Sequence, residues 1–142
     1  MSRLRSAIRI MCGYQGRDVR CDGATVLVIE DDEATRAMVI AALADEGYVA
    51  IGARDGGEGI RLALEHRPAL ILLDLLMPRG SGLTFLEEHR ADGLRRTPVV
   101  VMTAAGDRDQ EEVRSLVDGV LAKPFDIEEL IDVAQRYCRP QP

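Results

Sequence analysis

The sequence contains no apolar run long enough to cross a membrane. Its strongly apolar runs are strand-length, far short of the roughly 20 residues that a membrane span requires. Positive charge is not in excess either, since 18 Lys and Arg stand against 24 Asp and Glu, a net charge of −6, and this does not favour nucleic acid as a partner. The three cysteines, Cys12, Cys21 and Cys138, show no metal-ligand spacing and cannot all pair. These absences favour a cytoplasmic protein without a membrane span.

The 142 residues allow one domain with a substantial core. Hydrophobic residues make up 46% and charged residues 30%, which is ordinary for a globular protein. The beginning of the chain differs, because its first 22 residues hold five arginines, two aspartates and no lysine. We expect residues 1–24 to be a basic, disordered N-terminal extension and residues 25–139 to form the domain. A basic amphipathic segment that touches a membrane surface or a partner is the alternative for this extension.

The stretch from Leu70 to Pro78 is the most informative in the chain. Its first four residues are apolar, Asp74 follows, and a proline closes the segment. A short apolar run of this kind predicts a strand buried on both faces. Asp74 then lies where the strand opens into a loop, which in a parallel sheet is the edge where ligands bind. Taken alone, the segment is equally compatible with an aspartate that merely caps a turn.

Strand-like and helix-like segments alternate from Thr25 onward. We predict strands at residues 26–29, 48–52, 70–74, 99–102 and 120–122. Five helices are expected between and after them, at about residues 33–46, 55–66, 83–91, 107–117 and 127–138. Because βα units of this length build parallel sheets with right-handed crossovers, the sequence predicts an α/β domain with a parallel sheet.

Chemically active residue types follow four of the predicted strands. Glu30 and Asp31 follow the first, Asp74 ends the third, Thr103 the fourth and Lys123 the fifth. The carboxyl ends of parallel strands share one edge, so we expect these side chains to meet there. A crowded set of carboxylates resists ionisation unless a cation is shared, and oxygen ligands suit Mg²⁺.

Lys123 is the only lysine in the chain. A lysine places a compact charge on a flexible stem, which suits a crowded site where one carboxylate or phosphoryl oxygen must be neutralised. Thr103, taken alone, is more often structural than functional, although its hydroxyl could donate to a phosphoryl oxygen beside it.

Four motifs together resemble the receiver domain of bacterial two-component response regulators. They are Val28–Asp32, Leu72–Pro78 with Gly82, Val101–Ala104 and Lys123–Phe125, and the resemblance covers Thr25 to about Tyr137. It implies a flavodoxin-like fold, a five-stranded parallel sheet of order 2-1-3-4-5 between five helices.

The resemblance also implies roles for individual residues. Asp74 would accept a phosphoryl group from a histidine kinase or a phosphotransfer protein. Glu30, Asp31, Asp74 and the backbone carbonyl of Leu76 would bind Mg²⁺. Thr103 would be the switch hydroxyl, and Lys123 would pair with the phosphoryl group.

Three features depart from the family's pattern. Val120 stands where the family usually has an aromatic residue, so the ring that the family couples to the switch hydroxyl is absent, and the sequence leaves open whether Thr103 acts as a switch here. The interval from Thr103 to Lys123 is about two residues short, which predicts a shortened or displaced fourth helix. Leu76 is apolar where a polar residue is common and offers nothing to orient water, which predicts a longer-lived phosphoryl group.

We expect a stand-alone receiver that signals to an unknown downstream protein, is not an enzyme, and is a possible homodimer through its fourth and fifth helices. The first alternative is a receiver that binds its partner independently of phosphorylation. The second is a phosphatase or phosphotransferase with an aspartyl-phosphate intermediate. Such enzymes generally need a carboxylate two residues after the nucleophile, where this chain has Leu76.

Overall fold

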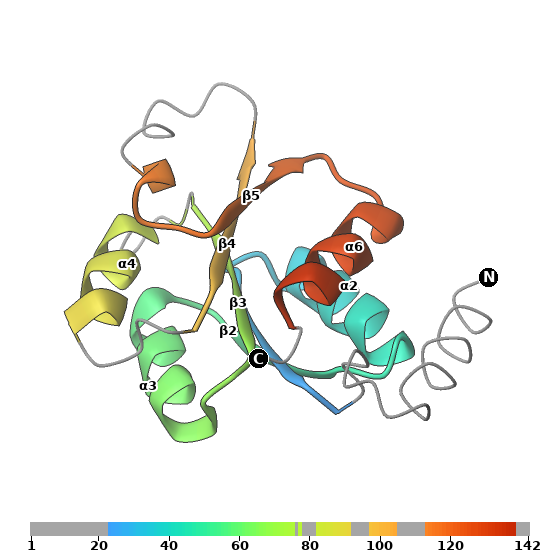
Figure 1. Cartoon of the computed structure of the whole chain (residues 1–142), viewed down its shortest axis with the longest axis horizontal. Helices are drawn as coiled ribbons and strands as arrows, with labels where there is room; N and C mark the ends of the chain where they lie inside the picture. Colours follow the sequence, from blue (N-terminus) through green and yellow to red (C-terminus); the bar gives the residue numbers. More distant parts are fainter. Residues whose placement is uncertain (1–22, 76, 78–81, 92–96, 105–112, 139–142) are drawn as a thin grey trace.

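A five-stranded parallel sheet runs through the middle of the computed structural model, which describes residues 23–75, 77, 82–91, 97–104 and 113–138 (Figure 1). The strands are β1 (Thr25–Ile29), β2 (Val49–Ala53), β3 (Leu70–Asp74), β4 (Val99–Ala104) and β5 (Gly119–Lys123). All neighbouring pairs are parallel, in the order β2-β1-β3-β4-β5. The predicted fold class and strand order are confirmed.

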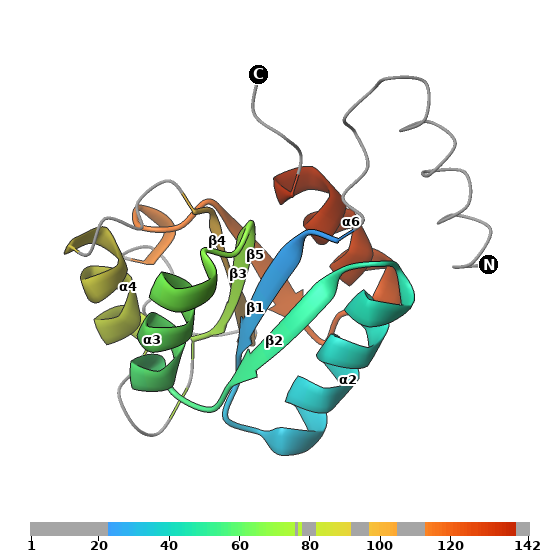
Figure 2. The ribbon, with the colours of Figure 1, turned by 90° about the horizontal axis from the view of Figure 1, so that it is seen from below.

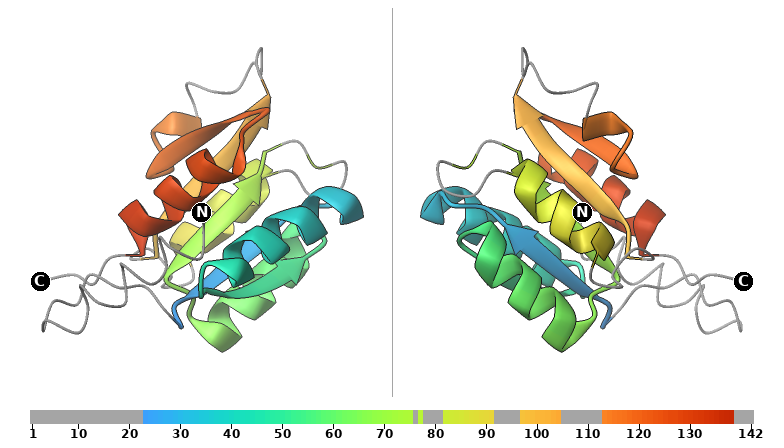
Figure 3. Two further views of the ribbon diagram at one scale, coloured as in Figure 1. Left: turned by 90° about the vertical axis from the view of Figure 1, so that its right-hand side faces the viewer. Right: turned by 90° about the vertical axis from the view of Figure 1, so that its left-hand side faces the viewer.

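Two layers of helices cover the sheet. In the described part of the chain, the helices of two turns or more are α2 (Glu33–Asp45), α3 (Gly56–His66), α4 (Gly82–Ala91) and α6 (Ile127–Tyr137). Helices α2 and α6 lie on one face and α3 and α4 on the other, as the two side views show (Figure 3). The predicted helix at residues 107–117 falls mostly outside the described residues. Within the part of it that the structure describes, Val113 and Arg114 are helical.

Side-chain caps fix the starts of these helices. At α6 a capping box is present: the Asp126 carboxylate accepts from the Glu129 N–H, and the Glu129 carboxylate accepts from the Asp126 N–H. At α3 the Asp55 carboxylate accepts from the Glu58 N–H, but the Glu58 carboxylate accepts from the N–H of Arg54. The return bond therefore reaches one residue before the N-cap, where a capping box would use the N–H of Asp55 itself.

Two residues in the left-handed backbone region end helices and redirect the chain. Gly47, just after α2, has φ +96°, a conformation that glycine adopts without steric cost. Arg67 has φ +47° just after α3 and is followed by Pro68, which cannot continue the helix. Both breaks lie close to the predicted helix ends at about residues 46 and 66, so β3 starts at Leu70 as predicted and β2 starts at Val49, one residue later than predicted.

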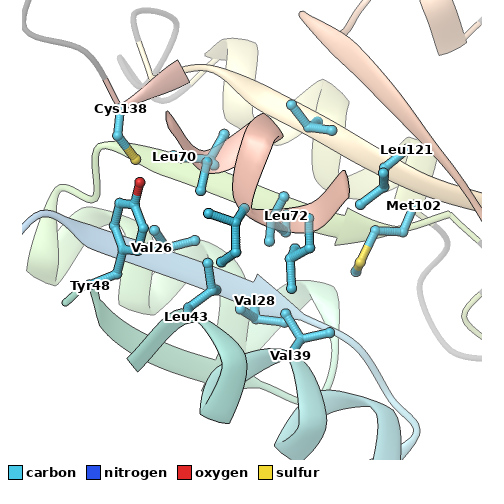
Figure 4. Close-up of a cluster of buried hydrophobic side chains, with 14 residues drawn as sticks. Val26, Val28, Val39, Leu43, Tyr48, Leu70, Leu72, Met102, Leu121 and Cys138 are labelled. Carbon is cyan, nitrogen blue, oxygen red and sulfur yellow. The ribbon is translucent and has the colours of Figure 1, made fainter. Parts of the chain in front are cut away.

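The three inner strands, β1, β3 and β4, are buried on both faces because their alternate side chains enter separate cores. Val28 and Leu72 contribute to the core beneath α2 and α6 (Figure 4). Ile29 and Leu73 contribute to the core beneath α3 and α4. All five residues of β3 are buried, which explains why it reads as an unbroken apolar run ending on Asp74.

The view from below shows α2 and α3 on opposite sides of β1 and β2 (Figure 2). Helix α3 packs closely on β1 at Gly59, where a Cβ atom would lie 2.5 Å from Ile29 Cδ1. Within the described ranges, no helix has both the length and the apolar character needed to cross a membrane.

Candidate functional site

The carboxyl ends of four strands bring the predicted site residues to one edge of the sheet. Register pairs Ile29 with Leu73, Asp74 with Met102, and Ala104 with Lys123, so the ends of β1, β3, β4 and β5 lie next to one another. Glu30 directly follows β1, and Thr103 is the second-to-last residue of β4. This is the edge at which parallel α/β sheets bind their ligands.

Lys123 links two carboxylates from distant parts of the chain. Its Nζ lies 3.2 Å from Glu30 Oε1 and 3.3 Å from Asp74 Oδ1. The side chains of Glu30 and Asp74 are 2% and 7% exposed, whereas that of Lys123 is 29% exposed. The ammonium group therefore contacts both nearly buried carboxylates from the more open side of the site, and its single charge can compensate only one of them.

Burial makes Glu30 a weaker acid than usual. Its pKa is raised from 4.5 to about 7, first by removal of the carboxylate from water and then by its hydrogen bond and charge repulsion with Asp74. A hydrogen bond from the Asp32 N–H to Glu30 Oε2, at 3.2 Å, and the charge of Lys123 oppose this rise. The site thus holds more negative charge than one lysine compensates.

The same charges act on Lys123 in the opposite sense. Burial disfavours its ammonium form, but the carboxylates of Asp74 and Glu30 outweigh burial and raise the pKa of Lys123 above 10.5. Lys123 is therefore a permanent cation at neutral pH and cannot serve as a proton acceptor there.

The first two acidic residues after β1 contribute to the cluster. One carboxylate oxygen from each of Glu30, Asp31 and Asp74 lies within 4.8 Å of the others, and Asp31 is exposed. Asp32 instead caps α2, because its Oδ2 accepts from the N–H of Thr35 at 2.8 Å and from its hydroxyl at 2.6 Å. These two bonds lower the pKa of Asp32.

The donor set fits Mg²⁺. All three candidate ligands are carboxylates, which suit a hard divalent cation, and together they carry more negative charge than the single Lys123 ammonium group compensates. The fourth predicted ligand, the backbone carbonyl of Leu76, lies outside the described residues.

Thr103 is buried at the same edge. It is 3% exposed, and its hydroxyl donates to the backbone carbonyl of Ala104 at 3.3 Å. Its partner in the β4–β5 register is Ala122, one residue before Lys123. Val120 is 37% exposed on the same strand, so the described part of β5 presents a small aliphatic side chain to solvent there.

The sequence reasoning did not identify Arg36. Its Nη1 donates to the backbone carbonyl of Glu30 at 2.8 Å, so it contacts the residue at the centre of the acidic cluster. A weak signal was present in Gly52, because glycine inside a strand often marks a close approach by another part of the chain. A Cβ atom at Gly52 would lie 3.0 Å from Cδ of Arg36.

An open hollow of about 400 Å³ adjoins the cluster and has a mainly apolar lining. It is formed by residues from α2, from the end of β4, and from the end of β5 with the two residues that follow it: Thr35, Met38, Ala104, Lys123, Pro124 and Phe125. The site is therefore reached from the side that carries the Lys123 ammonium group.

Comparison with known proteins agrees with this arrangement. Residues 26–135 match the response regulator receiver domain family, so the chain belongs to that family of signalling modules.

Individual relatives are more specific. The sequence is 36% identical over 110 residues to the phosphate regulon transcriptional regulatory protein PhoB of Escherichia coli K12, covering 75% of this chain and 48% of PhoB. It is 38% identical over 109 residues to the transcriptional regulatory protein HprR of the same organism, with the same coverage. The chain thus spans about half the length of the curated relatives it matches.

Among solved structures, the chemotaxis response regulator CheY4 of Vibrio cholerae is similar throughout. The TM-score is 0.75 at 31% identity, and the match covers 81% of this chain and 98% of that protein. The receiver domain of the Francisella response regulator 1452 gives a TM-score of 0.74 at 28% identity, covering 82% and 97%.

Proposed function

We propose that this chain is a phosphorylation-dependent signalling receiver in which Asp74 accepts a phosphoryl group from a histidine kinase or phosphotransfer protein. The observation that carries the proposal is the Lys123 ammonium group held between Asp74 and Glu30. Phosphoryl transfer requires mainly in-line positioning and neutralisation of charge. The structure supports both requirements, because Lys123 holds a positive charge beside the buried Asp74 carboxylate and the acidic cluster could hold a divalent cation on the same edge.

In the proposed reaction, a carboxylate oxygen of Asp74 attacks the phosphorus atom of a phosphohistidine. An O–P bond forms, the P–N bond breaks, and the leaving imidazole takes up a proton. Lys123 faces the phosphoryl oxygens from the open side of the site, and the Thr103 hydroxyl exchanges its bond to Ala104 for one to a phosphoryl oxygen.

Glu30, Asp31, Asp74 and the carbonyl of Leu76 are the proposed ligands of Mg²⁺, which when bound would neutralise negative charge on the transferred group. The hollow beside Lys123 supports access by a donor protein, because it leaves the edge of the sheet open. A cytoplasmic location fits such a donor.

The proposed output is altered binding to a downstream protein, with no small-molecule substrate turned over. Nucleic acid is not proposed as a partner because the net charge is −6. A second candidate, binding independent of phosphorylation, is favoured by one observation: Val120 is an exposed valine where the family usually carries the aromatic partner of the switch hydroxyl.

Beryllofluoride and acetyl phosphate test the proposal. With Mg²⁺, the protein should form a beryllofluoride adduct, and acetyl phosphate should add the mass of one phosphoryl group. Asp74→Asn should do neither, whereas Asp132→Asn, at an exposed position on α6, should behave as wild type. Absence of an adduct on the wild type, or an equal adduct on Asp74→Asn, would overturn the proposal.

Hydrogen exchange separates the two candidate outputs. If phosphorylation controls the output, the beryllofluoride adduct should change amide exchange in β4 and β5. Unchanged exchange in both strands, in a protein that does form the adduct, would favour the phosphorylation-independent candidate.

A further inference from the structure

Arg36 reaches from the first turn of α2 back over the end of β1. Its guanidinium Nη1 donates to the backbone carbonyl of Glu30 at 2.8 Å. Glu30 is 1% exposed, so its carbonyl has little access to water as a substitute partner. Hydrogen bonds from a charged donor are stronger than neutral ones, and a buried carbonyl that loses its donor is costly.

With this bond, Glu30 is held at every polar group. Its N–H donates to the carbonyl of Ala53 on β2 at 3.0 Å. Its carboxylate receives Lys123 on Oε1 and the N–H of Asp32 on Oε2. The backbone is thus hydrogen-bonded on both sides of the Glu30 Cα atom. These bonds fix the direction of the Cα–Cβ bond and therefore the direction in which the carboxylate points.

The neighbouring strand leaves room for the Arg36 side chain. A Cβ atom at position 52 of β2 would lie 2.9 Å from Ile40 Cδ1 and 3.0 Å and 3.3 Å from Cδ and Cγ of Arg36. The contact with Ile40 is shorter than real Cβ atoms make, and the contacts with Arg36 are tighter than most, so a larger residue at Gly52 would press on both side chains. The glycine and the arginine therefore form one packing unit at the end of β1.

We propose that Arg36 is a positioning residue for the acidic cluster: by fixing the Glu30 carbonyl it holds the Glu30 and Asp31 carboxylates in the orientation that binds Mg²⁺. This inference rests on the proposed function. Arg36 acts through the backbone, and its loss should weaken metal binding more than it slows transfer at saturating Mg²⁺. Groups outside the first ligand shell commonly have this effect.

The test is Mg²⁺ binding by calorimetry, without any phosphodonor, on wild type and Arg36→Met. Methionine keeps an unbranched stem beside Gly52 but removes the donor. We expect Mg²⁺ affinity to fall by about tenfold, the lower end of the range for such outer-shell groups. In acetyl phosphate reactions the Mg²⁺ concentration for half-maximal rate should rise, while the rate at saturating Mg²⁺ stays near that of wild type.

Two further variants sharpen the result. Arg36→Lys retains a charged donor and should recover part of the lost affinity. Arg61→Met removes an arginine of α3 whose side chain is 62% exposed and pairs with Glu58, and it should leave Mg²⁺ binding unchanged. Gly52→Ala should weaken binding in the wild type and add no further loss to Arg36→Met.

Each outcome decides the inference. Wild-type Mg²⁺ affinity in folded Arg36→Met would overturn it and leave the proposed function intact, as would an equal loss in Arg61→Met. If Arg36→Met does not fold, as judged by circular dichroism, Arg36→Lys and Gly52→Ala carry the test, and wild-type affinity in both would overturn it. Failure of the wild type itself to bind Mg²⁺ would overturn the proposed function and this inference together.

Discussion

Replacing Glu30 with glutamine should change how the stability of the protein depends on pH. The pKa of Glu30 is raised from 4.5 to about 7 by burial and by Asp74. Between these two pH values, Glu30 is protonated in the folded protein and ionised in the unfolded chain. The contribution of this group to stability is therefore complete below pH 4.5 and is lost as the pH rises to about 7. Because glutamine cannot ionise, Glu30→Gln should not lose stability over this pH range through this group.

The size of the effect follows from the two pKa values. The difference between 4.5 and about 7 corresponds to about 3 kcal/mol of unfolding free energy once the pH exceeds both values. The variant does not leave Lys123 without a carboxylate, since Asp74 Oδ1 remains 3.3 Å from Nζ. We therefore expect Glu30→Gln to gain about 2 to 3 kcal/mol relative to wild type between about pH 5 and pH 8.

Urea unfolding at constant ionic strength with a chelator measures this directly. Glu87→Gln, at an exposed position of α4, is the matched control and should follow the wild-type profile. Added Mg²⁺ should stabilise the wild type at about pH 8 and leave Glu30→Gln unaffected, because a ligand stabilises only the form that binds it. Parallel pH profiles for wild type and Glu30→Gln would refute the reasoning.

Four further substitutions have defined outcomes. Gly59→Ala places a Cβ atom 2.5 Å from Ile29 Cδ1 and should lower the free energy of unfolding by about 1 to 3 kcal/mol; Gly57→Ala, whose nearest contact is an ordinary 3.5 Å, should stabilise α3 by about 0.5 to 1 kcal/mol. Denaturant unfolding that ranks these two alanines equally would contradict this. Leu72→Ala, at a fully buried position, should cost about 2 to 5 kcal/mol in the same assay, and a cost near zero would contradict its place in the core. Lys123→Met should raise the pKa of Glu30 further by removing its positive neighbour, and carboxyl NMR titration that shows no rise would contradict the charge balance.

Much of the fold follows from the sequence because two kinds of signal agree. The apolar run at β3 predicts a strand buried on both faces, and all five of its residues are buried. Gly47 and the Arg67–Pro68 pair predict helix ends, and both adopt backbone conformations that end helices. Strand ends differed by one or two residues, since hydrogen bonding to neighbours extends β4 to Ala104 and β5 to Lys123, and no local pattern records it.

The meeting of Glu30, Asp74 and Lys123 also follows from the sequence. Each stands at the end of a predicted strand, and topology alone brings parallel strand ends to one edge. The hydrogen-bond partners of these side chains at that edge cannot be predicted from the sequence. The two hydrogen bonds from Lys123, and the bond of Thr103 to the carbonyl of Ala104, depend on side-chain rotamers set by packing.

Arg36 illustrates what a linear reading misses. Its contact with Glu30 spans six residues and runs from a side chain to a backbone carbonyl. No periodic pattern of residue types in the sequence marks such a contact. The only trace in the sequence is Gly52, on a strand that follows α2 and lies next to β1. The importance of a glycine that makes room for an arginine is seen only once both are placed in space.

Reductive trapping of the phosphorylated residue tests the central claim most directly. After reaction with acetyl phosphate and Mg²⁺, borohydride converts an aspartyl phosphate to homoserine, and peptide mass spectrometry locates the converted residue. The account predicts conversion at Asp74 in the wild type and none in Asp74→Asn. Conversion at another aspartate, or none in a wild-type protein that binds Mg²⁺, would contradict it.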